Sequence, residues 1–269
     1  PKNPAFSGAE GDMEVFILAP SVSFNYTPRI EAPWTLSAQG AFAGSFNHDF
    51  STSRNSVSSS VSVTPGYFFE DFSLNLPLSY SYAMLRNPGF NGYTETLSAG
   101  PLFRKILGQT QILELYAGLS STEYIQGPLT PEEDQDANSW NSYISWIWLF
   151  KEGAFLNLRY EFIDEDTDGS SWDNLGHKFS VSSTIPVKDK LSLQLSGEAF
   201  LQDFKNNHSL LSYLETRQNE TYKGTAGLTW AFQKNINIVV QYSRTRAYSI
   251  IGNYDYEQDL YMCGVEYNF

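Results

Sequence analysis

The stretch FSLNLPLSYSYAM, residues 72–84, alternates between large apolar and small side chains along its whole length. One side collects Phe72, Leu74, Leu76, Leu78, Tyr80, Tyr82 and Met84. The other side collects Ser73, Asn75, Pro77, Ser79, Ser81 and Ala83. Because successive side chains of a β-strand point to opposite faces, the stretch predicts a strand with one apolar face and one face of small, mostly polar residues.

The same alternation recurs along the chain, whereas helical spacing is almost absent. About thirteen strands are predicted, at residues 14–26, 34–46, 56–68, 72–84, 93–103, 111–119, 140–150, 155–162, 177–187, 191–201, 221–232, 236–245 and 260–269. Short links such as 151–153 and 233–235 take turns with longer ones such as 125–138 and 163–174. This order predicts an up-and-down meander, and residues 1–269 form one domain because composition does not change along the chain.

Composition decides which way the two faces point. Aromatic residues make up 16% of the chain and charged residues only 17%, below the roughly 25% of soluble domains. A soluble β-protein normally places charged side chains on its polar face, but here that face carries Ser, Thr, Gly, Asn and Ala. An outer-membrane barrel has the reverse arrangement, with apolar side chains toward lipid and polar ones toward the lumen.

Strand length and aromatic placement fit the same arrangement. Strands of about 10–13 residues can cross a hydrocarbon layer when tilted, and aromatic residues near strand ends form interfacial girdles, as in Trp140 with Trp148 and Phe150. Lipid offers no hydrogen bonds to the backbone, so the sheet must close. The sequence therefore predicts an all-β fold, a closed antiparallel up-and-down transmembrane β-barrel in the bacterial outer membrane. Its surroundings would be outer-membrane lipid and lipopolysaccharide.

The C-terminus ends in an apolar row, Tyr261, Cys263, Val265, Tyr267 and Phe269. This row resembles the assembly signal of bacterial outer-membrane barrel proteins, carried by Val265, Tyr267 and Phe269, and the resemblance implies the barrel-assembly machinery as a partner. With Phe269 at the periplasmic end, thirteen strands would start the chain outside the cell. Because such barrels usually have an even strand number, we expect a further first strand within residues 1–13 and fourteen in all, with twelve as the alternative.

Two segments carry a narrower resemblance. They are RYEFIDEDTDGSSWDNLGHKFSVSS (159–183) and RQNETYKGTAGLTWAFQKNINIVVQYSRTRAYSIIGNYDYEQDLYMCGVEYNF (217–269). Their spaced Arg, Tyr and Gly residues are similar to those of the C-terminal barrels attached to periplasmic tetratricopeptide repeats, of which the surface lipoprotein assembly modifiers are one group. The resemblance implies export or display of a macromolecule across the outer membrane, with a periplasmic or surface protein as partner.

The predicted lumen is lined by small side chains, which favours a wide barrel holding water or a plug. Charged residues expected to face it are Arg159, Glu161, Lys178, Glu198, Lys223 and Arg244. They either set the electric field of a channel or pair across neighbouring strands and stiffen the wall. The expected function is a channel or translocation barrel. The alternative is a non-transporting structural or surface-binding barrel whose extracellular loops carry the function.

Candidate sites for chemistry are few. His48, His177 and His208 are scattered, so no catalytic residue and no enzyme activity is expected, and the net charge of −13 excludes nucleic acid as a partner. The stretch DEDTDGSSWDN (164–174) spaces Asp164, Asp166 and Asp168 as calcium loops do, with Gly169 for a turn. Leu175 stands where an EF-hand has its glutamate, however. We expect no cofactor except Ca²⁺ at this loop; the alternative is a solvated acidic extracellular loop.

Overall fold

The computed structural model describes residues 15–47, 55–86, 89–128, 130–151, 153–207, 216–251 and 254–269. Its strands are β1 (Ile17–Leu18), β2 (Ser21–Tyr26), β3 (Trp34–Asn47), β4 (Ser56–Phe68), β5 (Phe72–Asn75), β6 (Leu78–Arg86), β7 (Phe90–Ala99), β8 (Leu102–Leu107), β9 (Gln111–Tyr124), β10 (Ala137–Lys151), β11 (Ala154–Thr167), β12 (Asn174–Lys188), β13 (Leu191–Phe204), β14 (Gln218–Gln233), β15 (Ile236–Ser249) and β16 (Tyr256–Tyr267). One 3-10 helix, η3, spans Pro131–Glu133. Among these residues, no helix is long and apolar enough to cross a membrane.

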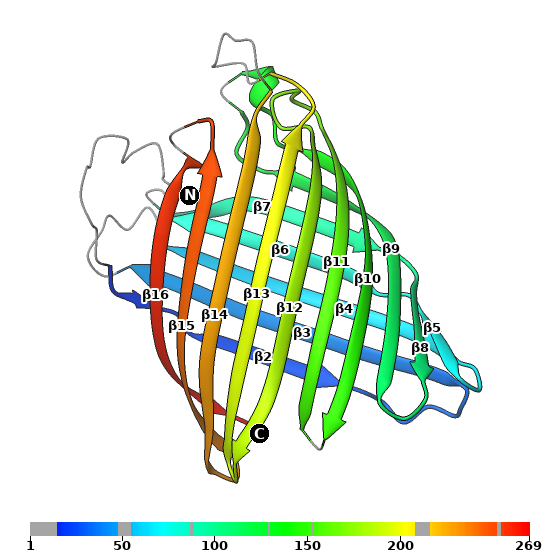
Figure 1. Cartoon of the computed structure of the whole chain (residues 1–269). Coiled ribbons are helices and arrows are strands. Elements are labelled where there is room, and N and C mark those ends of the chain that lie inside the picture. The colour runs from blue at the N-terminus through cyan, green and yellow to red at the C-terminus, as the bar shows by residue number, and fades with distance from the viewer. Residues whose placement is uncertain are drawn as a thin grey trace.

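All sixteen strands belong to one sheet whose pairs are antiparallel, and the sheet curls so that β10–β16 form a front wall and β2–β7 a rear wall (Figure 1). Three predicted strands are each split in two. Thus β1 and β2 both pair with β3, β5 and β6 both with β4, and β7 and β8 both with β9. Each split falls at a proline, namely Pro20, Pro77 or Pro101, because proline has no N–H to continue a ladder. The meander therefore makes thirteen passes.

The two edges of the sheet are formed by β16 and by β1 with β2. Among the described residues, β16 pairs with β15 alone, and β1 and β2 pair with β3 alone. An odd number of antiparallel passes leaves both edges running in the same direction. The fourteenth strand that we expect within residues 1–13 would run opposite to both, but it lies outside the described part of the chain.

The links between strands differ at the two ends of the sheet. Several of the short turns at the lower end need a positive φ, which occurs at Gly108 (66°), Gly153 (73°) and Lys190 (67°). The C-terminus lies at this end in Figure 1, and the longer links lie at the other. Several strands reach further toward the long links than predicted; β11, for example, continues to Thr167 instead of ending near residue 162. The turn end is the periplasmic end of the predicted topology.

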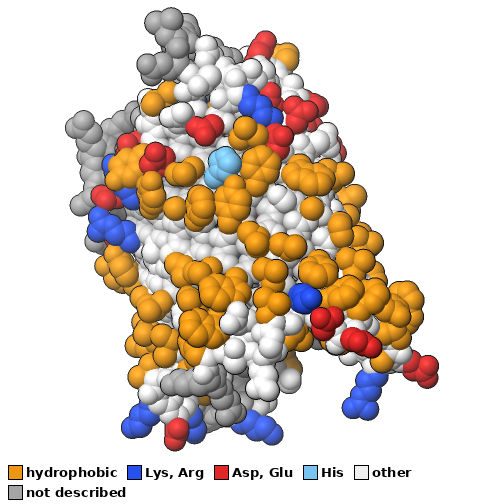
Figure 2. Space-filling model, turned by 45° about the vertical axis from the view of Figure 1, so that its right-hand side comes forward, with side chains coloured by type: hydrophobic (Ala, Val, Ile, Leu, Met, Phe, Trp, Pro, Cys, Tyr) orange, Lys and Arg blue, Asp and Glu red, His pale blue; other side chains and the backbone are white. Residues whose placement is uncertain are grey.

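Large apolar side chains cover the outside of this sheet. The buried hydrophobic residues among the described ones are Ala137, Ala154, Phe204, Val239 and Ala247, too few for the core of a soluble domain of this size. Meanwhile Tyr261 is 78% exposed, Val265 73% and Leu119 62%, and Figure 2 shows hydrophobic side chains spread over the outer surface. Burial of this surface requires lipid, as the sequence predicts.

Two neighbouring residues of β4 test the direction of the faces. Val61 lies in the apolar row and Ser60 in the polar row, and both are solvent-exposed in the isolated chain. We expect Val61→Arg to lower the free energy of unfolding in lipid bilayers by about 2–4 kcal/mol, because it places a charge in hydrocarbon. Ser60→Arg should change it by only about 0.5 kcal/mol, because water reaches that side chain. Reversible urea unfolding in vesicles measures both, and equal losses would mean that the faces are assigned wrongly.

Candidate functional site

Six charged side chains share the inner face across β11–β14; Glu165 lies at the upper end of β11, opposite Asn174, and we call the other five the charge ladder. They are Arg159, Glu161, Lys178, Glu198 and Lys223. The register sets Glu161 opposite Lys178 and Glu198 opposite Lys223. Ion pairs join Arg159 to Glu161 and Lys178 to Glu198, each at 3.0 Å. The charges therefore alternate in sign across the wall; the first pair lies within β11, and the second joins the neighbouring strands β12 and β13.

Aromatic rings and a further ion pair extend the ladder toward β8. The guanidinium of Arg159 lies 3.6 Å from the ring centre of Tyr143, which in turn stacks on Tyr116 at 5.2 Å. Arg104 on β8 pairs with Glu114 on β9 at 2.6 Å. Tyr143 and Tyr116 are directly opposite in the register of β9 and β10. This side of the lumen is thus a continuous band of paired charges and tyrosines.

The wall formed by β2–β7 is different in kind. Within the described residues of these strands the inner rows hold no charged side chain, and hydroxyl groups dominate: Ser21, Ser23, Thr35, Ser37, Ser58, Ser60, Ser62, Thr64, Ser79, Ser81, Thr94, Thr96 and Ser98. Neighbouring hydroxyls bond across strands, as Ser79 does with Ser98 at 2.6 Å. Those of β2 and several of β4 are exposed although they point inward. The lumen is therefore two-sided, charged on one wall and hydroxylated on the other.

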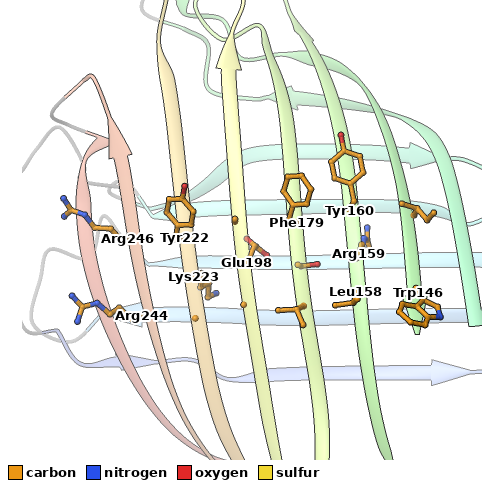
Figure 3. A pocket seen from close by; sticks show the side chains of 16 residues that line it. Trp146, Leu158, Arg159, Tyr160, Phe179, Glu198, Tyr222, Lys223, Arg244 and Arg246 are labelled. Atoms are coloured by element: carbon orange, nitrogen blue, oxygen red, sulfur yellow. The ribbon is translucent and has the colours of Figure 1, made fainter. Parts of the chain in front are cut away.

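Arg244, which the sequence assigned to the lumen, lies instead on the outer face. The register aligns it with Gly224, and Gly224 with Gly197, in the row that continues to the apolar side chain of Val181. It pairs there with Glu257 at 2.7 Å, and Figure 3 shows Arg244 and Arg246 directed away from Lys223. The apolar row of β15 ends in arginines because its upper end leaves the hydrocarbon, where a cation can meet carboxylates and water. The alternation in the sequence already indicates that Arg244 points outward, since it is an even number of residues from the apolar side chains of the same row.

The predicted calcium residues are separated. Asp164 and Asp166 belong to β11, so they lie on one face of a strand, and Asp164 pairs with Lys205 at 2.7 Å. Asp168 follows the strand and lies instead with Asp134 and Asp136, whose carboxylate oxygens are all within 4.8 Å of one another. Asp173, at the end of the same link, accepts a hydrogen bond from the backbone N–H of Thr167 at 2.7 Å. The only described cluster that fits a hard cation thus includes one of the three predicted residues.

Two extracellular links pack against each other beside that cluster. The backbone N–H groups of Asp168, Gly169 and Ser171 donate to the carbonyls of Asp136, Asp134 and Glu132, at 2.8, 3.1 and 3.2 Å. A side chain at position 169 would collide with the backbone of Asp134. Glycine is therefore required at position 169 because two segments of the backbone approach closely there. This contact explains the glycine without a calcium loop.

Arg217 holds the cap formed by the links 168–173, 205–207 and 216–217 together with Tyr254. Its guanidinium lies 3.6 Å from the ring centre of Tyr254 and 4.3 Å from that of Phe204, and the residue is only 4% exposed. Burial lowers the pKa of Arg217 from its ordinary value, while the nearby Tyr254 acts in the opposite direction. Sequence patterns gave no signal for this cap, because its members come from three separate links.

The remaining sequence candidates are easily placed. His177 lies on β12, where its Nδ1 is 2.8 Å from the hydroxyl of Tyr160; His48 and His208 lie outside the described residues. The absence of enzyme activity stays a prediction. Val265, Tyr267 and Phe269 lie at the end of the outer row of β16 and are exposed, and their recognition by the assembly machinery also stays a prediction.

Comparison with known proteins places the fold. The chain is similar to OmpT, an outer membrane protein of Vibrio cholerae: the in-vitro folded form is 11% identical, over 93% of this chain and 95% of that one, with a TM-score of 0.54. The form expressed in the outer membrane is 12% identical, over 94% and 97%, with a TM-score of 0.51. No family model and no curated protein matches the chain.

The chain has the fold of a bacterial outer-membrane β-barrel. Together with the exposed apolar outer wall, this fold places it in the bacterial outer membrane. The charge ladder therefore lines the lumen of the barrel, and the cap stands on its extracellular side. The comparisons confirm the predicted fold class. Because the sequence identity is low, the similarity concerns the fold alone.

Calorimetric titration with Ca²⁺ tests whether the cluster of Asp134, Asp136 and Asp168 binds the ion. If the ion binds, Asp136→Asn should weaken binding at least about tenfold, because ligand charge determines affinity. Asp166→Asn, which removes a carboxylate of the same motif outside the cluster, should bind as the parent barrel does. Weaker binding in Asp166→Asn alone would restore the set read from the sequence, and an absence of heat in the parent would end the calcium prediction.

Proposed function

We propose that the barrel is a water-filled channel of the outer membrane. The observation that carries this proposal is the exposure of inward-facing side chains on the rear wall, where Thr35, Ser58 and Ser60 are all open to solvent. A narrow barrel fills its interior with side chains, whereas a wide one leaves room for water. Small hydroxyl groups bind water well and occupy little space, which suits the passage of polar solutes.

The charge ladder and Glu165 together would give this channel little net preference among ions. The ladder holds three cations, Arg159, Lys178 and Lys223, against the two carboxylates Glu161 and Glu198. Glu165, higher on the same face of β11, balances the third cation, so the field along this wall is weak. Pairing therefore stiffens the wall and keeps the charges balanced, so that the loss of any one charge should alter the preference among permeant ions.

Changing Glu198 to Gln should raise the anion preference of the conducting barrel. The variant removes one of the carboxylates that oppose the cations, and a single charge in a wet lumen changes ion energies by roughly 1 kcal/mol or less. We therefore expect a roughly two- to fivefold shift in the chloride-to-potassium permeability ratio, measured from reversal potentials in planar bilayers. Glu257→Gln is the matched control, because Glu257 has the same charge but pairs with Arg244 on the outer wall.

The permeability ratios of the two variants show whether the charge ladder lines the conducting path. Equal shifts in Glu198→Gln and Glu257→Gln would mean that the ladder does not line the conducting path. Absence of current in the parent barrel at every voltage would overturn the channel proposal itself.

We further propose that the passage serves export, as the membrane-embedded part of an export or surface-display system. The proposal is supported by the similarity of residues 159–183 and 217–269 to barrels that follow periplasmic tetratricopeptide repeats. A two-sided lumen, hydroxylated on one wall and bearing paired charges on the other, offers contacts to a polar chain without binding it tightly.

A photo-reactive amino acid at position 60 tests export in cells. Ser60 faces the lumen, so we expect illumination to link it to a polypeptide in transit, detected as a shifted band and identified by mass spectrometry. Position 61, on the outer face of the same strand, is the control and should link only to lipid. Polypeptide adducts at neither position, in cells where the barrel conducts, would contradict export while leaving the channel proposal intact.

The alternative function, a non-transporting barrel whose loops bind at the cell surface, is favoured by the cap alone. Arg217 and the paired backbones of residues 132–136 and 168–171 make a rigid extracellular platform. A closed barrel carrying this platform would show no current, so the bilayer recordings decide between the two functions.

A further inference from the structure

A groove of about 630 Å³ lies on the outer wall where β9, β10 and β11 leave the apolar belt. Its side chains form two rows of the register. The lower row is Leu119, Trp140 and Asp164, and the upper row is Ser121, Asn138 and Asp166. Each row therefore takes one residue from each of the three strands, and the groove changes from apolar to polar within two residues along them.

The polar side chains of the upper row have unused hydrogen-bonding groups. Among the described residues, no hydrogen bond or ion pair engages the side chains of Ser121, Asn138 or Asp166, and all three are exposed. Asp164 is different, because its carboxylate accepts a hydrogen bond from Lys205 at 2.7 Å. One amide, one hydroxyl and one unpaired carboxylate thus point to the same space above an indole ring that is 46% exposed.

The position of the groove limits what can occupy it. Its lower edge belongs to the hydrocarbon-facing surface, with Leu97 and Leu119 each 62% exposed, and above it stand the acidic extracellular links. A molecule in the groove therefore has an apolar part at the level of the belt and a polar part above it, as a lipid of the outer leaflet does. The unpaired carboxylate of Asp166 repels phosphate and accepts hydrogen bonds from hydroxyl groups.

An indole ring flanked by carboxylate and amide groups is suited to a sugar. Trp140 offers a flat apolar surface to the C–H face of a saccharide ring, while Asp166 and Asn138 receive and donate hydrogen bonds at its rim. A few convergent polar groups beside an aromatic surface are the usual means of fixing such a ligand. We propose that this groove binds the saccharide headgroup of an outer-leaflet glycolipid, with Trp140 as the platform and Asp166 and Asn138 as hydrogen-bonding groups.

The test uses the full barrel in phospholipid nanodiscs, with and without a phosphate-free glycolipid, diglucosyl diacylglycerol, which joins an uncharged disaccharide headgroup to two acyl chains. Native mass spectrometry counts retained glycolipid as phospholipid is titrated in. We expect Trp140→Leu and Asp166→Asn each to lower retention by about tenfold. Trp230→Leu is the matched control, since Trp230 is also 46% exposed on the outer wall but lies near the periplasmic end of β14, and it should retain glycolipid as the parent does.

Each result decides the matter. Parent barrels without retained glycolipid, equal losses in Trp140→Leu and Trp230→Leu, or full retention in Asp166→Asn would overturn the proposal. Asp166→Asn keeps the shape of the side chain, so its result holds if Trp140→Leu fails to fold. The free glucose disaccharide of the same linkage is added to phospholipid nanodiscs in a parallel titration; binding there as strong as that of the glycolipid would assign the groove to soluble saccharides and overturn the glycolipid source. None of these outcomes depends on whether the barrel conducts.

Discussion

The pairing of backbone N–H and C=O groups within lipid is the constraint on which the rest of this structure depends. Hydrocarbon offers them no partner, so every pass of the chain needs a neighbour on each side. The meander supplies one almost everywhere, even across its proline breaks: the backbone N–H groups of Gly44, Gly100 and Ala117 donate to the carbonyls of Pro20, Pro77 and Pro101. These three prolines are tolerated because their carbonyls still accept hydrogen bonds, while the missing N–H falls at a break between two strands.

This constraint also gives the side chains of the two faces different roles. A sheet that must close has an inside and an outside, and alternation sends every second residue to each. The outer row is set by lipid and tolerates little besides apolar groups, whereas the inner row is free to carry function. That freedom explains why the charge ladder and the hydroxyl wall can differ so strongly around one lumen. At the upper rim both rows meet water, and there the outer face regains polar residues such as Asp166.

Period-two alternation made the strands predictable, since it is a local property that lipid enforces on every pass. All thirteen predicted ranges correspond to strands of the sheet, although those crossing Pro20, Pro77 and Pro101 are split. The site was harder to predict because it depends on register and on the height at which a strand leaves the membrane. Arg244 shows the second effect: it belongs to the apolar row, yet it is charged because its end of β15 lies beyond the hydrocarbon. The cap around Arg217 joins residues from separate links, which no local pattern records.

The stretch DEDTDG shows why spacing alone cannot identify a metal site. In a loop, alternate aspartates can fold around one ion, with each oxygen about 2.3–2.6 Å from it. In a strand, alternate residues are roughly 7 Å apart and point the same way, so they cannot converge on a single ion. Here the ladder with β10 carries β11 through Asp164 and Asp166 and ends only at Thr167. Those two aspartates therefore join a row on the outer wall, and Asp168, freed from the strand, turns toward Asp134 and Asp136. The neighbouring strand, and not the spacing of the carboxylates, determines which chemistry each of them can serve.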